Sequence, residues 1–178
     1  MKSLLTLILC VTGAALLQAA PTPTPEMTIQ YALSKDPKTW VMADSLTNGP
    51  IGEVVDYTSE WVPKGDDIEN WKEMFDVKTM LTSDTIAHHI ESWKTFLSQV
   101  DPKAEVNVQT NEDGSSLVTY KSIVADEMGI SRYFKGKDGI YVISYRMRPS
   151  AKKDERLKIW QGILSSATLV KNEKKGKA

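Results

Sequence analysis

Two adjacent histidines, His88 and His89, are the residues of this sequence whose type best suits acid–base or metal chemistry. Asp84 and Glu91 stand four residues before and three residues after His88, so a helix would bring a carboxylate beside its imidazole. The spacing differs from the His-Glu-x-x-His motif of zinc hydrolases. Successive helical side chains diverge by about 100°, so the two histidines do not easily share one ion. The pattern predicts no metal site and leaves open a small hydrolase that uses His88 with Asp84 or Glu91.

Sequence motifs of other enzyme classes are missing. There is no Gly-x-Ser-x-Gly elbow, no phosphate-binding loop that ends in Gly-Lys-Ser/Thr, and no Rossmann glycine pattern. Paired acids at residues 66–67, 112–113 and 126–127 fall in predicted loops or at element ends, where solvated carboxylates are the rule. We therefore expect a non-enzymatic protein without a cofactor.

The first residues have the pattern of a secretory signal peptide. Lys2 precedes an uncharged, mostly apolar run over residues 4–17, and small residues follow at Ala19 and Ala20. Such a run is typical of an export signal, whereas a membrane-spanning helix needs about 20 apolar residues. We expect cleavage after Ala19, a periplasmic or secreted protein, and no transmembrane span in the mature chain. Cleavage would also remove Cys10, the single cysteine, so that packing alone stabilises the fold.

The remaining chain divides into three parts. Alternating prolines and threonines at residues 21–25 favour an extended conformation, and we expect a linker over residues 20–36. Residues 37–170 have the length and apolar content of one globular domain. Four lysines within residues 171–178 predict a basic disordered tail.

Hydrophobic periodicity predicts the element order of this domain. We expect three strands, a helix, two hairpins and a second helix, over residues 39–46, 53–62, 71–81, 84–100, 104–124, 130–148 and 150–167. Asn48-Gly49-Pro50 favours a turn after the first strand, and Asp66 with Glu69 has the spacing of a capping box for a short helical turn. The order predicts an α+β domain in which amphipathic helices pack on an antiparallel sheet.

Two short motifs suggest a family. Pro63-Lys64-Gly65 followed by Asn70-Trp71-Lys72-Glu73-Met74 resembles a pattern in small exported bacterial proteins of uncharacterised function. The element order resembles the PsbP/Mog1-like α/β/α sandwich. This resemblance implies a binding or accessory protein of the bacterial cell envelope, and it brings no catalytic residue with it. Trp71 either anchors the loop to the sheet or faces a ligand groove.

Charge is distributed unevenly along the chain. Residues 20–101 carry 6 basic and 14 acidic side chains, net −8, and residues 102–178 carry 15 and 9, net +6. The two halves either neutralise each other in the fold or leave a cationic surface for an acidic envelope component or a protein partner. For such a surface the contact residues would be Arg132, Arg146 and Arg148, together with Trp71. A further alternative is a carrier that holds a small apolar ligand between helix and sheet. We expect a monomer that does not bind nucleic acid.

Overall fold

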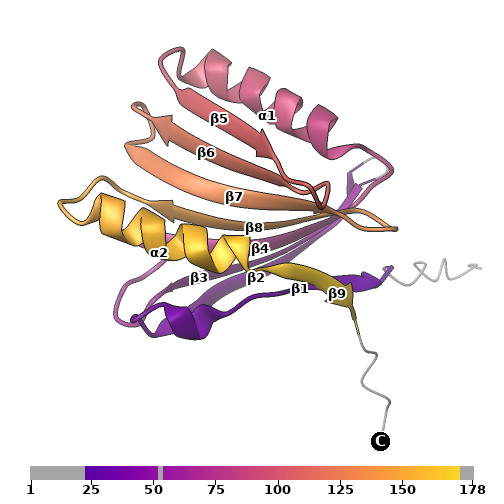
Figure 1. Cartoon of the computed structure of the whole chain (residues 1–178), viewed down its shortest axis with the longest axis horizontal. Helices are drawn as coiled ribbons and strands as arrows, with labels where there is room; N and C mark the ends of the chain where they lie inside the picture. The colour runs from indigo at the N-terminus through magenta and orange to yellow at the C-terminus, as the bar shows by residue number, and fades with distance from the viewer. Residues whose placement is uncertain (1–22, 52–53, 173–178) are drawn as a thin grey trace, which may run out of the picture.

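A seven-stranded antiparallel sheet forms the centre of the computed structural model, which describes residues 23–51 and 54–172 (Figure 1). Its spatial order is β2 (Trp40–Ile51), β3 (Val54–Pro63), β4 (Glu73–Leu81), β8 (Ile140–Met147), β7 (Glu127–Lys135), β6 (Ser116–Ser122) and β5 (Glu105–Thr110). β4 pairs with β8, with Phe75 opposite Tyr145. The acidic and basic halves of the chain therefore meet in the middle of the sheet.

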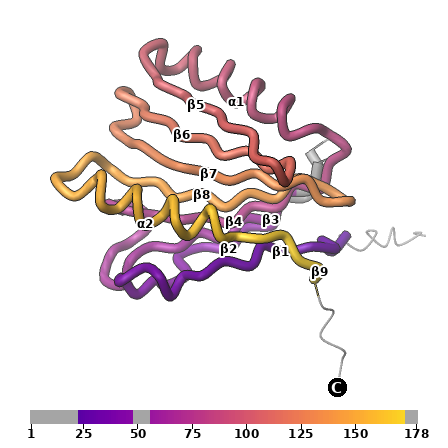
Figure 2. Tube along the Cα trace, viewed as in Figure 1, coloured from indigo at the N-terminus to yellow at the C-terminus, as the bar shows by residue number. Residues whose placement is uncertain are grey.

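The two long helices cover opposite faces of this sheet. Helix α1 (Ile86–Val100) packs Ile86 and Ile90 against one face, and helix α2 (Lys153–Ser165) packs Trp160 and Ile163 against the other. Figure 1 shows α2 crossing in front of β8 while α1 lies beside β5, and Figure 2 shows the same arrangement along the Cα trace. The predicted α+β class and the helix–sheet–helix layering are confirmed.

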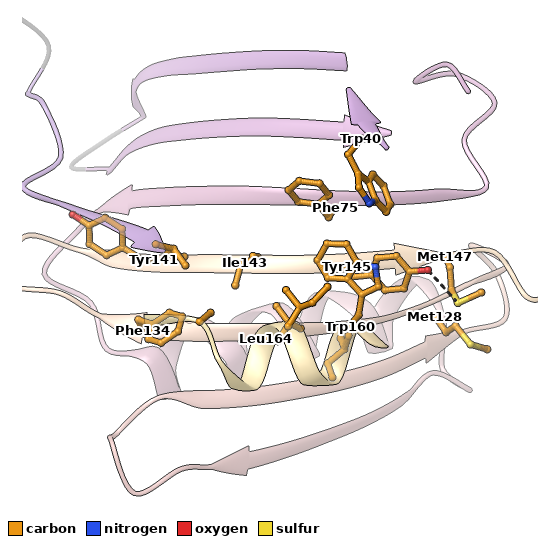
Figure 3. Close-up of a cluster of buried hydrophobic side chains, with 14 residues drawn as sticks. Trp40, Phe75, Met128, Phe134, Tyr141, Ile143, Tyr145, Met147, Trp160 and Leu164 are labelled. Atoms are coloured by element: carbon orange, nitrogen blue, oxygen red, sulfur yellow. Dashed lines mark hydrogen bonds between the residues drawn. The ribbon is translucent and has the colours of Figure 1, made fainter. Parts of the chain in front are cut away.

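Aromatic side chains fill the core beneath α2 (Figure 3). The Trp160 ring stacks on Tyr145, with centroids 4.6 Å apart, and lies 5.2 Å from Phe75 and 5.5 Å from Trp40. Trp160, Tyr145 and Phe75 have no exposed surface. Rings of this size each bury about 150–250 Å², so this cluster supplies much of the apolar burial that stabilises the domain.

Both predicted hairpins form. β5 pairs with β6 and β7 with β8, in continuous antiparallel registers. Between β5 and β6 the Gly114 N–H donates to the Asn111 carbonyl at 3.0 Å, and Gly114 adopts φ +77°. Glycine adopts this left-handed conformation without a side-chain clash, which is why the turn signal was reliable.

The first strand is longer than its sequence predicts. Asn48-Gly49-Pro50 lies within β2, which continues to Ile51, and Ile51 pairs with Val54 of β3. β2 is an edge strand, and an edge tolerates proline because the missing N–H has no partner strand on one side. The predicted helical turn after β3 does not form. Instead, the Asp67 carboxylate accepts the N–H groups of Glu69 and Asn70, at 3.0 and 2.7 Å.

The predicted extended linker, residues 20–36, contains ordered structure. Strand β1 (Met27–Gln30) pairs with β9 (Thr168–Lys171), and a 3-10 turn, η1 (Leu33–Lys35), follows. Lys171, which the sequence placed in the tail, belongs to β9. An isolated four-residue strand has a weak sequence signal, and its partner lies about 140 positions away. The predicted signal peptide, residues 1–19, and residues 173–178 of the tail lie outside the described residues.

A buried ion cluster fastens this N-terminal segment to the domain. The Arg156 guanidinium of α2 donates to Asp36 at 2.8 and 3.1 Å and to Glu73 of β4 at 2.9 Å. Glu73 also accepts from Lys38 at 2.8 Å. Every charge in the cluster has an opposite partner, as burial requires.

Within the described ranges, neither α1 nor α2 has the length and hydropathy of a bilayer-spanning helix.

Candidate functional site

A cleft of about 610 Å³ lies between α1 and the sheet. Its floor comes from β3, β4, β6, β7 and β8, and its walls come from α1, β2 and the segment after β6. Because side chains alternate across a strand, the residues beside the buried Phe75 and Tyr145 face the opposite side of the sheet, toward α1. Those neighbours are Asp76 and Arg146, so a polar floor lies beneath the helix.

Arg146 occupies the middle of this floor. Its Nη2 lies 3.3 Å from Glu60 Oε1, 3.3 Å from Asp76 Oδ1 and 3.0 Å from the Met74 sulfur. Its Nε is buried and has no hydrogen-bond partner among the described residues. A buried donor without a partner costs about 1–3 kcal/mol, and such groups are concentrated at functional sites. Arg146 is therefore held in place by long contacts and retains unused hydrogen-bonding capacity.

Burial of the charged carboxylates on the floor costs free energy. Burial raises the pKa of Asp76, and the neighbouring Arg146 only partly offsets this effect. Asp56 pairs with Lys78 at 3.0 Å, and Glu127 accepts the Tyr120 hydroxyl at 2.8 Å. Each charged group therefore already has a partner inside the protein.

Two serines and two tyrosines complete the floor. Ser131 and Ser144 stand opposite each other on β7 and β8, and Tyr120 and Tyr133 flank them. Burial raises the pKa of Tyr133 to about 12, so its hydroxyl is a neutral donor at physiological pH. Gly129 makes room for Tyr120, since a Cβ there would lie 2.5 Å from the tyrosine ring.

The walls and mouth of the cleft are apolar. Trp93 and Leu97 of α1 face the floor, and Trp93 meets Tyr120 edge-on at 5.3 Å. At the mouth, four large side chains from three segments are strongly exposed: Leu46 (46%), Phe96 (61%), Val100 (49%) and Val124 (70%). Single exposed apolar residues are ordinary, but a group that lines one opening marks a binding surface.

The two histidines have different surroundings. His89 lines the cleft, 5.9 Å from the Tyr133 ring, and burial, with a further contribution from Lys78, lowers its pKa. His88 is exposed on the outer side of α1, with Nδ1 3.7 Å from Asp84 Oδ1, and Glu91 pairs with Lys94 instead. The predicted His88–carboxylate pair therefore exists only as a solvent-exposed contact outside the cleft. Across the described residues, no three His, Cys, Asp or Glu side chains are grouped as metal ligands.

Arg132, a predicted contact residue, is buried on the α2 side of the sheet. Its guanidinium donates to three carbonyls at the end of α2, those of Leu164, Ser165 and Ala167, at 2.7–3.0 Å. It also donates to the side chains of Asp113 and Ser115, in the loop between β5 and β6, at 2.6 and 3.1 Å. These contacts satisfy carbonyls that a helix end leaves without partners. Arg132 is thus a structural cap and is not available to a partner.

Trp71 and Arg148, also predicted contact residues, lie together at one end of β4 and β8. Arg148 Nε donates to the Trp71 carbonyl at 3.2 Å, and its guanidinium lies 5.3 Å from the Trp71 ring. Arg146 approaches the same ring at 5.7 Å. The half-buried Trp71 therefore packs beneath two arginines and anchors its loop.

A second hollow, of about 840 Å³, borders Arg148. Its cations Lys64, Lys72 and Arg148 are exposed, and Lys38 is paired with Glu73. Exposed lysines are solvated and interact weakly with a partner. The cleft under α1, whose polar groups are buried, is the stronger candidate site.

Opposite charges of the two halves meet at close range. Arg146 contacts Glu60 and Asp76, and Arg156 contacts Asp36 and Glu73. Of the two interpretations of the charge asymmetry, the mutual neutralisation of the halves accounts for these arginines. Arg132, Arg146 and Arg148 do not form one cationic surface.

Sequence reasoning missed most of the floor residues. In β3 the polar residues Asp56, Thr58 and Glu60 occupy alternate positions, a pattern that is typical of a strand with one solvated face. A stronger signal was available in Asp76, Ser144 and Arg146, polar residues at alternate positions of central strands. In a sheet with two packed faces, such residues indicate a polar cavity.

Comparisons with known proteins concern the family and the fold. A protein-family model matches residues 48–169. No curated protein matches this sequence. The solution structure of cyanobacterial PsbP (CyanoP) from Synechocystis sp. PCC 6803 is similar with a TM-score of 0.51 and 11% identity, over 87% of this chain and 99% of that one. At this identity the likeness shows a shared PsbP-like fold and carries no function with it.

Proposed function

This chain belongs to the protein family whose model matches residues 48–169, and we propose that it is an exported, non-enzymatic protein that binds a small molecule in the cleft under α1. The observation that carries the proposal is the cleft itself, with the under-satisfied Arg146 on its floor. Its volume of about 610 Å³ falls in the range of roughly 300–1,000 Å³ that is usual for small-molecule sites.

The lining of the cleft supports binding rather than catalysis. A general base needs a reacting group within hydrogen-bond reach. The exposed His88 faces no enclosed substrate space, and the charged side chains of the floor are engaged with one another. Apolar walls and a few hydrogen-bonding groups are instead the usual composition of a binding pocket.

Export rests on the N-terminal sequence. The apolar run over residues 4–17 and the small residues that follow it favour removal of a signal peptide. We expect mature protein in the periplasm or medium with Ala20 at its N-terminus. Mass spectrometry of fractionated cells checks this, and intact Met1 in a cytoplasmic fraction would contradict it.

Binding is tested with N-phenyl-1-naphthylamine, an uncharged probe that fluoresces in apolar surroundings. We expect saturable binding to the wild type and at least about tenfold weaker binding to Ser144→Phe, which fills the floor. Ser45→Phe places the same ring on exposed β2, outside the cleft, and serves as the matched control.

A second cleft variant keeps the test valid if Ser144→Phe does not fold. Phe96→Ser changes a side chain that is 61% exposed at the mouth, so it leaves the fold intact and weakens probe binding. Wild-type affinity in both cleft variants, or no saturable binding by the wild type, would refute the proposed site.

A further inference from the structure

We infer that the cleft under α1 takes an uncharged amphiphile, whose hydroxyl- or amide-bearing head meets the sheet and whose apolar chain leaves between Phe96 and Leu46. This inference rests on the proposed function and specifies its ligand. Three properties of the cleft lead to it: the division between polar floor and apolar mouth, the internal pairing of the floor charges, and the hydrogen-bonding groups that remain.

Polar and apolar groups are separated by depth. The floor carries Glu60, Asp76, Ser131, Ser144 and Arg146, whereas the mouth carries Leu46, Phe96, Val100 and Val124. A ligand that matches both zones must have a polar end and an apolar end. Burial of the mouth side chains against such a chain would gain about 25 cal/mol for each Å² removed from water.

The charges of the floor exclude an anionic head. Glu60, Asp76 and Glu127 outnumber Arg146, and Lys78 is already paired with Asp56. A carboxylate or phosphate that took Arg146 would leave Glu60 and Asp76 without their cation, and their side chains are only 22% and 13% exposed. A largely buried carboxylate that loses its partner is strongly destabilised.

A cationic head meets the opposite obstacle. To reach Glu60 or Asp76 an ammonium group must approach the Arg146 guanidinium, which lies 3.3 Å from both carboxylates. Like charges at this separation repel strongly in a partly buried site. Both ionic heads therefore disrupt a charge arrangement that is already complete.

Neutral hydrogen bonds are what the floor can still make. Ser131 presents a hydroxyl group, the Ser144 hydroxyl can accept while it bonds the Asp76 carboxylate, and Arg146 Nε has no acceptor. A hydroxyl or amide both donates and accepts, so it satisfies such groups without adding charge. A site of this kind discriminates by what it penalises as much as by what it attracts.

Three probes with the same ten-carbon chain test the inference by displacement of N-phenyl-1-naphthylamine: monodecanoylglycerol, decanoate and decyltrimethylammonium, each below its micelle concentration. We expect monodecanoylglycerol to bind at least about tenfold more tightly than either ion. Equal or tighter binding of an ion would overturn the inference while leaving the cleft as a binding site. Failure of all three to displace the probe would count against the ligand class, whereas failure of the probe itself to bind refutes the proposed function.

A charge variant tests the reason for the discrimination. Glu60→Gln removes one negative charge from the floor, so decanoate affinity should strengthen by about threefold or more relative to monodecanoylglycerol affinity. Glu91→Gln removes the same charge from the outer side of α1, where the side chain is 67% exposed, and should alter neither. An unchanged preference in Glu60→Gln would show that the floor charges do not select the head.

Discussion

At the scale of single residues, three arginines with similar sequence surroundings have three different roles. Arg132 caps α2, Arg146 lies on the cleft floor, and Arg148 covers Trp71 at the surface. Arg146 and Arg148 are two positions apart, so strand alternation predicts one face for both, but it does not show which side chains a distant helix will cover. That information depends on tertiary packing.

The cap formed by Arg132 makes a stability prediction. Arg132→Ala leaves buried helix-end carbonyls unsatisfied and should lower the free energy of unfolding by about 3 kcal/mol. Arg148→Ala removes an exposed arginine and should cost below about 1 kcal/mol. Urea unfolding of both variants measures the difference, and equal losses would contradict the capping role.

Asp101 makes a prediction about pH. The N–H of Val124, together with Ser122 and the N–H groups of Ile123 and Lys103, holds the pKa of Asp101 below its usual range. A carboxyl whose pKa is lower in the folded state stabilises the protein above the unfolded pKa of about 3.9, and this contribution is lost as pH falls through the folded pKa. Asp101→Asn should therefore show a shallower loss of stability below about pH 4. Parallel stability curves for the two proteins would exclude this role.

At the scale of elements, the sequence predicts the apolar face of α1 correctly, but it does not predict that this face borders an open cleft. Apolar residues of α1 recur at spacings of three and four along one stripe, and Ile86, Ile90 and Leu97 of this stripe are buried. Trp93, Leu97 and Val100 of this stripe also line the cleft, so the face is only partly covered by a closed core. Periodicity identifies the face that a helix presents, but it does not show whether that face is fully packed.

Helix α1 begins at Ile86, two residues later than the predicted range 84–100, and its N-cap is Thr85. Its hydroxyl accepts the His88 N–H at 3.1 Å. Thr85→Ala should lower the free energy of unfolding by about 1 kcal/mol. Thr95→Ala, an exposed threonine within the same helix, is the matched control and should change it by less than about 0.5 kcal/mol. Indistinguishable thermal unfolding of the two variants would argue against the cap.

Local patterns explain which elements were predictable. The two hairpins and α1 have turn residues or periodicity within one continuous segment, and each forms close to its predicted place. β1 and β9 have no comparable signal, because each is four residues long and is stabilised by a partner at the other end of the chain. β2 passes through Gly49-Pro50 because its position at the sheet edge, which sequence does not reveal, tolerates proline.

At the scale of the whole molecule, the ends of the chain are tied to the centre. β1 pairs with β9, and Arg156 joins Asp36 of the N-terminal segment to Glu73 of the central sheet. The cleft is likewise a property of the whole, since its lining comes from segments between Leu46 and Arg146. For this reason the sequence allowed a carrier as an alternative but did not place its cavity.

Removal of the Arg156 charge tests this long-range connection. Arg156→Met keeps most of the side-chain volume but leaves Asp36 and Glu73 buried without their main cation, and it should cost about 3–5 kcal/mol. Amide hydrogen exchange should show the greatest loss of protection in β1 and β9, where the N-terminal segment is held. Loss confined to α2 would mean that the cluster does not fasten that segment.

The most direct test of the binding cleft is a two-dimensional NMR titration of the ¹⁵N-labelled protein with monodecanoylglycerol. Trp93 lies in the cleft and Trp160 in the core beneath α2, so their indole N–H signals report the two faces separately. Binding in the cleft predicts saturable shifts of the Trp93 indole and of the amides of Phe96, Ser144 and Arg146, with the Trp160 indole unmoved. Shifts centred on α2 or on Trp71, or no saturable shift of the Trp93 signal, would contradict it.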